Sequence, residues 1–319
     1  MKVAFLSNKL TLRGTEIAMY DYAFYNRTLL GNESVIITRD IKKNSSLYDI
    51  SQLVYDKFNK EFEMFYYETT EDIDNIIIEQ KIDVLYIIKA GGKADGLITN
   101  KCKCVIHAAL AGGDPHGDVY AAISEHTSVS MPIVYHMINI NDTNETMRNE
   151  LNIPNNATVF GTYSGKECFN VQYMKDVVQT ISNNPALSHI YFIFMNIEEF
   201  MLPNNNVIFL DGTSDMFVKR KFINTCDAML YGRGCGETFG LSIGEFCLSK
   251  KPIICPATAP SRFHLDILGD SAITHNNFDE LYYILTNWNY EFQNKICPEK
   301  YERFTPLKVM EQFKTVFLS

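Results

Sequence analysis

Short apolar runs alternate with helical patterns along nearly the whole chain, and this alternation limits the folds that the chain can adopt. Several runs contain Val, Ile and aromatic residues without polar alternation, as is typical of strands covered on both faces. A helical pattern begins near Gly14, and another occupies residues 71–80. The N-terminal part therefore predicts an α/β domain with a parallel sheet. Its strands are expected at residues 2–7, 34–38, 63–67, 83–89 and 103–108.

The same alternation begins again after a polar, Asn-rich run at residues 139–158, which is the best candidate for a linker. A chain of 319 residues is long enough for two domains of ordinary size. We expect an N-terminal domain at residues 1–150, a C-terminal domain at 151–300 and a final helix at 301–319. The C-terminal strands are expected at residues 158–163, 189–196, 206–211, 227–231 and 251–257.

The composition limits the partners of the chain. Its net charge of -9 argues against a nucleic-acid-binding surface, which would require a basic face. No run approaches the roughly 20 apolar residues that span a bilayer, and the first run is too short for a signal peptide. We expect a cytoplasmic protein, in the host cytoplasm if the chain is viral. Peripheral membrane contact and oligomeric state stay open.

No metal or cofactor is expected from the sequence. Cys102 and Cys104 form a lone Cys-x-Cys without a second ligand pair nearby. Asp72 and Asp74 form an Asp-x-Asp, but they lie in a helical pattern and are better explained as a solvated helix start than as a manganese site. The chain also lacks a nucleophile elbow and a P-loop lysine motif, so hydrolase and NTPase functions are disfavoured.

Glycines and glutamates are concentrated at residues 230–255. Gly232, Gly234 and Gly236 alternate with other residues between a strand pattern and a helical pattern, which predicts a strand-to-helix turn. The backbone N–H groups at such a helix start attract phosphate. Gly240 and Gly244 are expected inside the helix, where glycines usually allow the close approach of another backbone or a ligand.

Two glutamates accompany these glycines. Glu237 lies at the expected helix start, and Glu245 lies about 12 Å further along the axis. That distance resembles the reach of a nucleotide-diphosphate sugar from its sugar ring to its ribose. Taken singly, each glutamate is more often a favourable dipole partner or a solvated residue. A dinucleotide fingerprint is disfavoured because it requires a glycine at the position of Glu237.

The stretch GETFGLSIGEFCLSKKPII resembles the Glu-x7-Glu motif of retaining GT-B glycosyltransferases, especially the family 4 or "group 1" type. The matching residues are Glu237, Phe239, Gly240, Leu241, Glu245, Lys251, Pro252 and Ile253. The resemblance implies two Rossmann-like, doubly wound domains that face each other across a cleft, and a C-terminal helix that crosses back to the first domain. It also implies a nucleotide-diphosphate sugar donor (UDP- or GDP-sugar), a glycan or other hydroxyl acceptor, metal-independent transfer and retention of configuration.

The resemblance also suggests individual site residues. Residues expected at the chemical step are Glu237, His116, Lys166 and Arg233. Expected donor-binding residues are Glu245, Thr238, Phe239, Gly240, Leu241, Gly14, Thr15, Gly161 and Thr162, and the expected acceptor-side residues are Asp114, Asp118 and Lys89.

The chain departs from the family pattern at two places. Thr162 stands where an arginine is expected, and Lys166 comes one residue early. The usual glycine turn after residue 255 is replaced by a segment in which Arg262 and His264 are candidates for the site. Two alternatives therefore stay open: a glycosyltransferase-like binding protein with weak or no catalysis, and a sugar-nucleotide epimerase. The base, the sugar and the acceptor also stay open.

Overall fold

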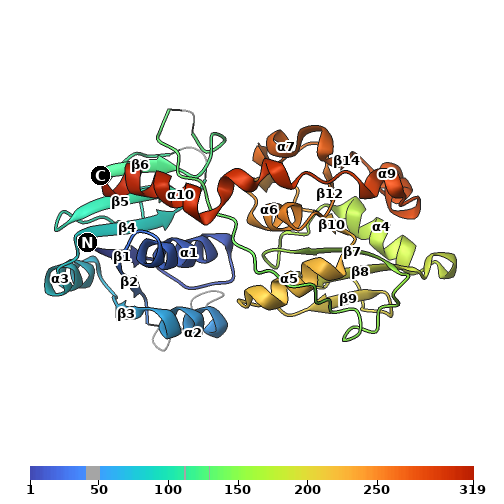
Figure 1. Ribbon diagram of the computed structural model, residues 1–319, viewed down its shortest axis with the longest axis horizontal. Helices are drawn as coiled ribbons and strands as arrows, with labels where there is room; N and C mark the ends of the chain where they lie inside the picture. The colour runs from blue at the N-terminus through green and yellow to red at the C-terminus, as the bar shows by residue number, and fades with distance from the viewer. Residues whose placement is uncertain (41–50, 111–112, 129) are drawn as a thin grey trace. The chain divides into compact units, whose positions relative to one another are not determined.

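A computed structural model of the chain describes residues 1–40, 51–110, 113–128 and 130–319. It divides into two compact units (Figure 1). The first contains Met1–Met137 and Phe304–Ser319, and the second contains Ile138–Arg303. The division falls earlier in the chain than the boundary expected after residue 150, and the final segment belongs to the first unit.

The first unit is built on a six-stranded parallel sheet with the order β3-β2-β1-β4-β5-β6. The strands that the apolar runs predict are confirmed, whereas the short β6 was not expected. The strands are β1 (Lys2–Leu6), β2 (Glu33–Thr38), β3 (Glu63–Tyr66), β4 (Val84–Lys89), β5 (Lys103–Ala108) and β6 (Val119–Ala122).

Alternate residues of β1 enter cores on opposite faces of this sheet. Phe5 packs in a cluster that includes residues of α1 (Gly14–Thr28), α2 (Gln52–Glu61) and α10 (Pro306–Phe313). Leu6 packs on the other side with residues of α3 (Thr70–Gln80). Helices therefore cover both faces, which explains why the strand sequences are apolar throughout.

The second unit repeats this design. Its sheet has the order β14-β12-β10-β7-β8-β9, and all neighbouring strands are parallel. The strands are β7 (Thr158–Tyr163), β8 (Ile190–Met195), β9 (Val207–Leu210), β10 (Ala228–Leu230), β12 (Ile253–Pro256) and β14 (Ile273–His275). A separate two-stranded sheet pairs β11 (Gly236–Glu237) with β13 (Ser261–Arg262).

Helices again lie on both faces of the second sheet. Residues of α4 (Gln172–Ser182) and α8 (Phe278–Thr286) share one core with alternate strand residues. On the other face, Tyr163 contacts rings from α5 (Met216–Thr225) and α6 (Leu241–Leu248). The shorter helices are α7 (Phe263–Leu268) and α9 (Tyr290–Gln293).

Both sheets have the same topology. The first strand of each unit lies in the middle of its sheet, the next two strands lie on one side of it, and the last three lie on the other side. The strand order reverses between β1 and β4 in the first unit and between β7 and β10 in the second. In doubly wound sheets, ligands bind outside the carboxyl ends of the strands at this switch point. In the second unit, the loops at the switch point are residues 164–171 and 231–240.

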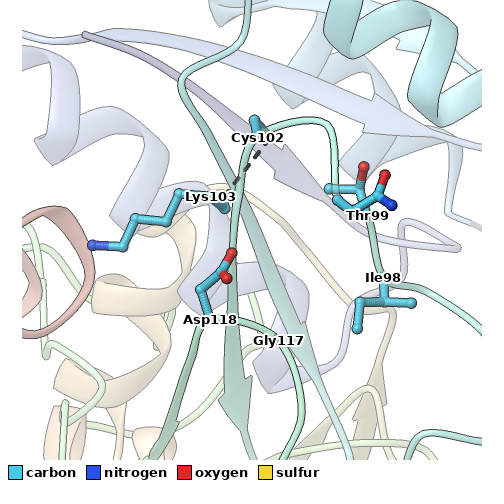
Figure 2. A pocket seen from close by; sticks show the side chains of 7 residues that line it. Ile98, Thr99, Cys102, Lys103, Gly117 and Asp118 are labelled. Carbon is cyan, nitrogen blue, oxygen red and sulfur yellow. Dashed lines mark hydrogen bonds between the residues drawn. The ribbon is translucent and has the colours of Figure 1, made fainter.

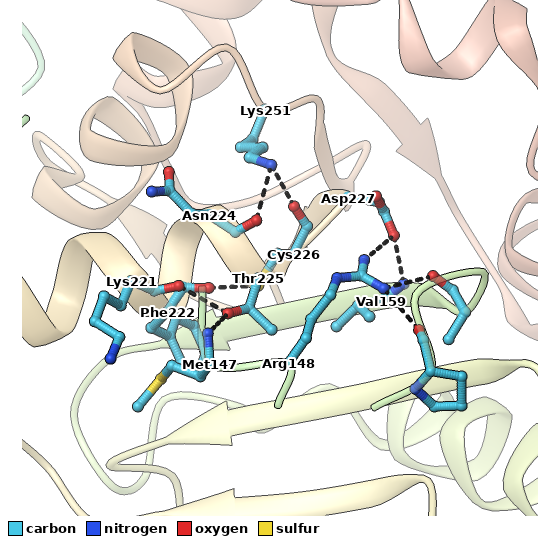
Figure 3. Close-up of polar contacts among 12 residues, drawn as sticks. Met147, Arg148, Val159, Lys221, Phe222, Asn224, Thr225, Cys226, Asp227 and Lys251 are labelled. Atoms are coloured by element: carbon cyan, nitrogen blue, oxygen red, sulfur yellow. Dashed lines mark hydrogen bonds and ion pairs between the residues drawn. The ribbon is translucent and has the colours of Figure 1, made fainter. Parts of the chain in front are cut away.

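The polar run at residues 139–158 is bonded to the amino edge of the second sheet rather than forming a free linker (Figure 3). Arg148 donates to the carbonyls of Pro154 and Ala157 at 3.1 and 3.0 Å and pairs with Asp227 at 3.2 Å. Asp227 also accepts the backbone N–H of Val159 at 2.7 Å. These contacts explain why the run belongs to the second unit.

Candidate functional site

The alternating glycines that follow β10 are required by packing. A Cβ on Gly232 would lie 2.5 Å from the ring of Phe169. Gly236 has a φ of +73°, and a Cβ there would lie 1.8 Å from the carbonyl oxygen of Ser261, its neighbour in the β11–β13 ladder. Larger residues at these two positions would therefore displace the turn. Close approach of protein groups accounts for both glycines without a ligand.

Gly234 ties this turn to the other loop of the switch point. Its N–H donates to Oδ1 of Asn170 at 2.8 Å, and the carbonyl of Gly232 accepts the N–H groups of Asn170 and Val171 at 3.0 and 3.2 Å. Lys166 is exposed in that same loop. The structure thus connects the loop that carries Lys166 to the turn that carries Arg233.

Glu237 is held between two side chains of its own turn. Its Oε2 pairs with Nη1 of Arg233 at 2.9 Å, and its Oε1 accepts from Oη of Tyr231 at 3.3 Å. Burial raises the pKa of the Glu237 carboxyl, while Arg233 and Tyr231 oppose that rise. The result is a mostly buried carboxylate in a fixed orientation beside a cation at the carboxyl edge of the sheet.

Tyr231 was not identified as a site residue from the sequence, although its neighbours Glu237 and His264 were. The Tyr231 ring is buried and packs on the ring of His264, with a centroid distance of 5.1 Å. The backbone of Arg262 pairs with Glu237 in the β11–β13 ladder, and its side chain pairs with Asp266 at 3.0 Å. The segment of Arg262 and His264 therefore supports the turn that carries Glu237. The available sequence signal was an aromatic residue directly after a strand.

Helix α6 begins with an uncapped N-terminus. Gly240 is its N-cap, with a φ of +88° and no side-chain hydrogen bond to the helix. The prediction that Gly240 lies inside the helix is wrong, because this positive φ ends the preceding turn rather than continuing a helix. The first N–H groups of a helix have no intrahelical acceptors and carry the positive end of its dipole, so this end attracts an anion.

The other expected residues around α6 differ in exposure. Gly244 lies inside the helix, where a Cβ would come within 2.7 Å of Ile138 and 2.8 Å of Tyr301. Phe239 is buried and stacks on Phe263. Thr238 and Leu241 are half-buried at the helix start. Phe239 and Gly244 thus fix the position of α6, while Thr238 and Leu241 lie nearer to its surface.

Glu245 is 4% exposed and accepts a hydrogen bond from the Tyr163 hydroxyl through Oε2. Burial and the neighbouring carboxylate hold the pKa of Tyr163 well above its usual value, so the phenol stays a donor. Within the part of the chain that the structure describes, no other group bonds to the Glu245 carboxylate. Its second oxygen is therefore left for another donor.

Gly161 and Thr162 lie inside β7, before its last residue. A Cβ on Gly161 would lie 2.6 Å from Sγ of Cys226 and 2.7 Å from Ile193, so strand packing explains this glycine. Thr162 is buried. The residue of β7 at the carboxyl edge is Tyr163, which the sequence did not single out.

In the first unit, Gly14 and Thr15 form the start of α1, next to the β1–β4 switch point. Thr15 donates to Oε1 of Glu16 at 2.9 Å, and Thr11 donates to Oε2 at 2.6 Å. Burial raises the pKa of Glu16, and the two hydroxyls lower it. Glu16 was not singled out from the sequence. Both of its oxygens are already used to hold the loop after β1.

Lys89 ends β4 at the same edge. Its ammonium pairs with Asp95 at 2.7 Å and also donates to the carbonyl of Leu97 at 3.4 Å. The side chain is almost completely buried. Lys89 therefore holds the loop that follows β4.

His116 and Asp114 lie close together in the segment that leads to β6. Nδ1 of His116 is 2.6 Å from the carbonyl oxygen of Asp114, and its ring packs on Tyr120. The Asp114 carboxylate is 3.4 Å from Nζ of Lys93. Nε2 of His116 is buried and has no hydrogen-bond partner among the described residues. The structure therefore keeps His116 and Asp114 together.

Asp118 lies at the amino edge of the first sheet, whereas Asp114 contacts Lys93 in the loop that follows the carboxyl end of β4. Asp118 accepts the N–H of Cys104 at 2.7 Å, at the amino ends of β5 and β6. Figure 2 shows it beside a pocket of about 650 Å³. The lining residues are Ile98, Thr99, Asn100, Cys102, Lys103, Gly117 and Asp118. Asp118 is therefore separated from the switch point, because the chain crosses from one edge to the other before β6.

Within residues 1–40, 51–110, 113–128 and 130–319, no group of three or more His, Cys, Asp or Glu side chains is arranged to hold a metal ion. Among the helices of these same residues, none is long and apolar enough for a membrane span.

Comparisons with solved structures identify the fold. The chain is similar to HepE of Anabaena in complex with UDP and glucose, with a TM-score of 0.74, 14% identity and coverage of 100% of each chain. A glycosyltransferase from Rickettsia africae gives a TM-score of 0.70 at 12% identity, over 99% of this chain and 97% of that one. A Listeria monocytogenes protein described as a UDP-N-acetylglucosamine 2-epimerase gives 0.60 at 11% identity, over 98% and 94%.

No family model matches the sequence, and no curated protein matches it either. What these structures share with the chain is the fold. The predicted architecture of two doubly wound parallel sheets is confirmed, and it is the GT-B fold.

Proposed function

We propose that this protein is a glycosyltransferase that uses a nucleotide-diphosphate sugar as donor. The observation that carries the proposal is the arrangement at the switch point of the second sheet. There, Glu237 lies on the turn before an uncapped helix start, and Glu245 lies inside the same helix with one free carboxylate oxygen. The similarity to HepE, which was solved with UDP and glucose, supports the same class of ligand.

Each part of a donor has a matching group in this arrangement. The start of α6 would bind the diphosphate, with Arg233 and the exposed Lys166 supplying positive charge. Glu245 would accept a hydrogen bond from a ribose hydroxyl through its free oxygen. Glu237 would accept hydrogen bonds from hydroxyls of the transferred sugar. Thr238 and Leu241, at the helix start, would contact the donor nearby.

The donor phosphate is the leaving group in this proposal. The bond between the anomeric carbon and the phosphate oxygen breaks, the acceptor oxygen forms the new glycosidic bond, and the acceptor proton passes to the departing phosphate. Positive charge at Arg233 and Lys166 stabilises the charge that develops on that phosphate. We propose retention of configuration, as in the family 4 type that the Glu-x7-Glu motif resembles, without a metal or cofactor.

The acceptor side is proposed for the first unit. Gly14 and Thr15 lie at its switch point, and His116 presents an unpartnered ring nitrogen near Asp114. Gly14, Thr15 and the Asp114 carboxylate would bind a glycan or other hydroxyl acceptor, and the ring of His116, with its Nε2 buried, would hold the backbone of Asp114 in place. Asp118 is left out of this proposal because it lies at the amino edge of the sheet.

A second candidate function is that of a sugar-nucleotide epimerase. The similarity to the Listeria monocytogenes protein favours it, since that structure has the same two-unit fold over nearly its whole length. An epimerase converts its sugar nucleotide without an acceptor, whereas a transferase releases nucleoside diphosphate when an acceptor is present. Product analysis of the sugar nucleotide by NMR, with and without acceptor, distinguishes the two functions.

A thermal-shift panel of UDP-, GDP-, ADP- and dTDP-glucose tests donor binding. A ligand at 100 times its Kd stabilises the folded state by about 2.7 kcal/mol, which raises Tm by several degrees. We expect one nucleotide to stabilise the wild type and Glu245→Ala to lose most of that shift. Glu291→Ala, on the exposed helix α9, is the matched control. If none of the four compounds shifts the wild type, the proposed function is wrong.

A further inference from the structure

Lys219 is a buried cation for which the fold supplies no anion. It lies on α5 and is 5% exposed. Within the described parts of the chain, its ammonium makes no ion pair and no side-chain hydrogen bond. Its close neighbour is the ring of Tyr163, with Nζ 5.4 Å from the ring centroid. A cation–π contact leaves the N–H donors of this ammonium unused, so Nζ can still donate a hydrogen bond to a ligand.

The neighbouring lysine on the same helix behaves differently. Lys221 pairs with Glu150 at 2.5 Å and with Glu145 at 3.5 Å. It therefore has the carboxylate partners that Lys219 lacks. Of these two lysines of α5, only Lys219 is without an ion pair among the described residues.

Lys219 and Glu245 contact the same phenol. The Tyr163 ring lies under the Lys219 ammonium, and the Tyr163 hydroxyl donates to Glu245. The ammonium and the carboxylate do not form an ion pair with each other, although both are buried. A donor group and an acceptor group are thus held near one tyrosine, each with capacity for a further partner.

These three residues lie at the carboxyl edge of the second sheet. Tyr163 is the last residue of β7, α5 begins after β9, and Glu245 lies on α6 beyond the helix start that would bind the diphosphate. A donor with its diphosphate at that start and its ribose at Glu245 would have its nucleoside beside Lys219. Tyr163, Lys219 and Glu245 therefore lie on the nucleoside side of the proposed site.

We propose that Lys219 binds an acceptor oxygen of the donor's nucleoside, on the ribose or on a base carbonyl. The inference rests on the proposed function, because it takes the ligand to be a nucleoside diphosphate. An ammonium that awaits a ligand decreases the stability of the free protein and increases its affinity for that ligand. Removal of the ammonium should therefore raise the stability of the free protein, or leave it unchanged, and lower the affinity for the ligand.

The test uses Lys219→Met, which keeps the length of the side chain and removes its charge. We expect the Tm of the ligand-free variant to equal or exceed that of the wild type. Titration calorimetry with UDP, GDP and ADP should show a 10- to 100-fold loss of affinity for the nucleotide that the wild type binds. Lys221→Met is the matched control and should keep wild-type affinity, since its charge pairs with Glu150 and Glu145.

The outcomes separate this inference from the proposed function. If the wild type binds neither these three nucleotides nor dTDP, the proposed function fails and the inference fails with it. If the wild type binds and Lys219→Met binds equally well, only the inference fails. A variant that unfolds or melts at a lower temperature without ligand would show that the ammonium serves the fold, which also overturns the inference. Where the wild type binds ADP as well as UDP or GDP, a loss confined to UDP or GDP assigns the contact to a base carbonyl, and an equal loss for every bound nucleotide assigns it to the ribose.

Discussion

Apart from the Arg233–Glu237 pair at the carboxyl edge, the two edges of the second sheet differ in how their buried charges are paired. At the amino edge, Arg148 pairs with Asp227, and Lys251 donates to the backbone carbonyl of Cys226 at 2.6 Å (Figure 3). At the carboxyl edge, Lys219 has no anion among the described residues, and Glu245 has a single donor. The same sheet and the same helices support both edges.

This difference separates groups that stabilise the fold from groups that are available to a ligand. A buried charge with all its partners inside the protein contributes to the native structure, whereas one with missing partners is tolerated when binding requires it. Substitutions at the amino edge should therefore affect stability, and substitutions at the carboxyl edge should affect binding and turnover.

The largest effect is expected at Glu237. Glu237→Gln keeps the shape of the side chain and removes the charge that pairs with Arg233 and that would bind the hydroxyls of the transferred sugar in the transition state. We expect turnover of the sugar nucleotide to fall by about 1,000-fold, as is typical when a group that acts in the transition state is removed. Nucleoside diphosphate release, followed by chromatography, measures it. Asp266→Asn, an exposed carboxylate of the same unit, should keep wild-type turnover. Equal loss in both variants would contradict the assignment.

Two buried histidines add titratable groups to the comparison of the two edges. His275 lies at the end of β14, also at the carboxyl edge, where its Nδ1 is 2.9 Å from the Tyr173 hydroxyl and its Nε2 is buried without a hydrogen-bond partner among the described residues. Burial lowers its pKa to about 4. Burial also lowers the pKa of His107, in the first unit, to about 4.

These two pKa values predict a loss of stability in acid. Because the unfolded histidine takes up its proton near pH 6.5, stability is complete above that pH and falls as the pH decreases toward 4. Each histidine should account for a loss of about 3 kcal/mol over this range. Chemical unfolding at several pH values measures the slope, and His275→Gln should make it shallower. A variant with the full slope would show that His275 is charged in the folded protein.

A smaller effect is expected at the amino edge. Asp227→Ala removes the acceptor of Arg148 and of the Val159 N–H. We expect the free energy of unfolding to fall by about 2 kcal/mol, the usual size for the loss of two such hydrogen bonds. Calorimetric Tm measures the change, and nucleotide affinity should stay at the wild-type value. A variant with unchanged Tm and weaker binding would reverse the roles assigned to the two edges.

The smallest effect is expected at Gly240. Gly240→Ala places a Cβ where φ is +88°, which costs about 1 kcal/mol. A Cβ there would lie 3.3 Å from Ile243 and 3.4 Å from Glu237, so the start of α6 should shift slightly. We expect a small decrease in Tm and a measurable loss of nucleotide affinity. If affinity is unchanged, the geometry of the helix start does not determine binding.

Much of the fold could be predicted from the sequence because its strands are apolar and follow each other at regular intervals. The strands at residues 2–6, 84–89 and 158–163 came directly from this pattern. The strands β6 and β14 were not expected, since VYAA and ITH are too short and too mixed to produce a recognisable pattern.

The site could be predicted only where its residues are close in the sequence. Glu237 and Glu245 share one motif, so their spacing indicated a common function. Tyr163 and Lys219 escaped prediction because they meet Glu245 only after the sheet brings distant segments together. Asp118 was misplaced for the opposite reason. It follows Asp114 by four residues, but between these two positions the chain runs from Lys93, in the loop after β4, to Cys104, at the amino end of β5.

The most direct test of the account is a crystal structure of the protein with the nucleoside diphosphate that stabilises it most. We predict that its phosphates lie against the N-terminus of α6 near Arg233 and that its ribose lies within hydrogen-bonding distance of Glu245. A nucleotide bound at any other place, with the Glu245 and Lys219 side chains still lacking new partners, would contradict the claim that the carboxyl edge of the second sheet is the donor site.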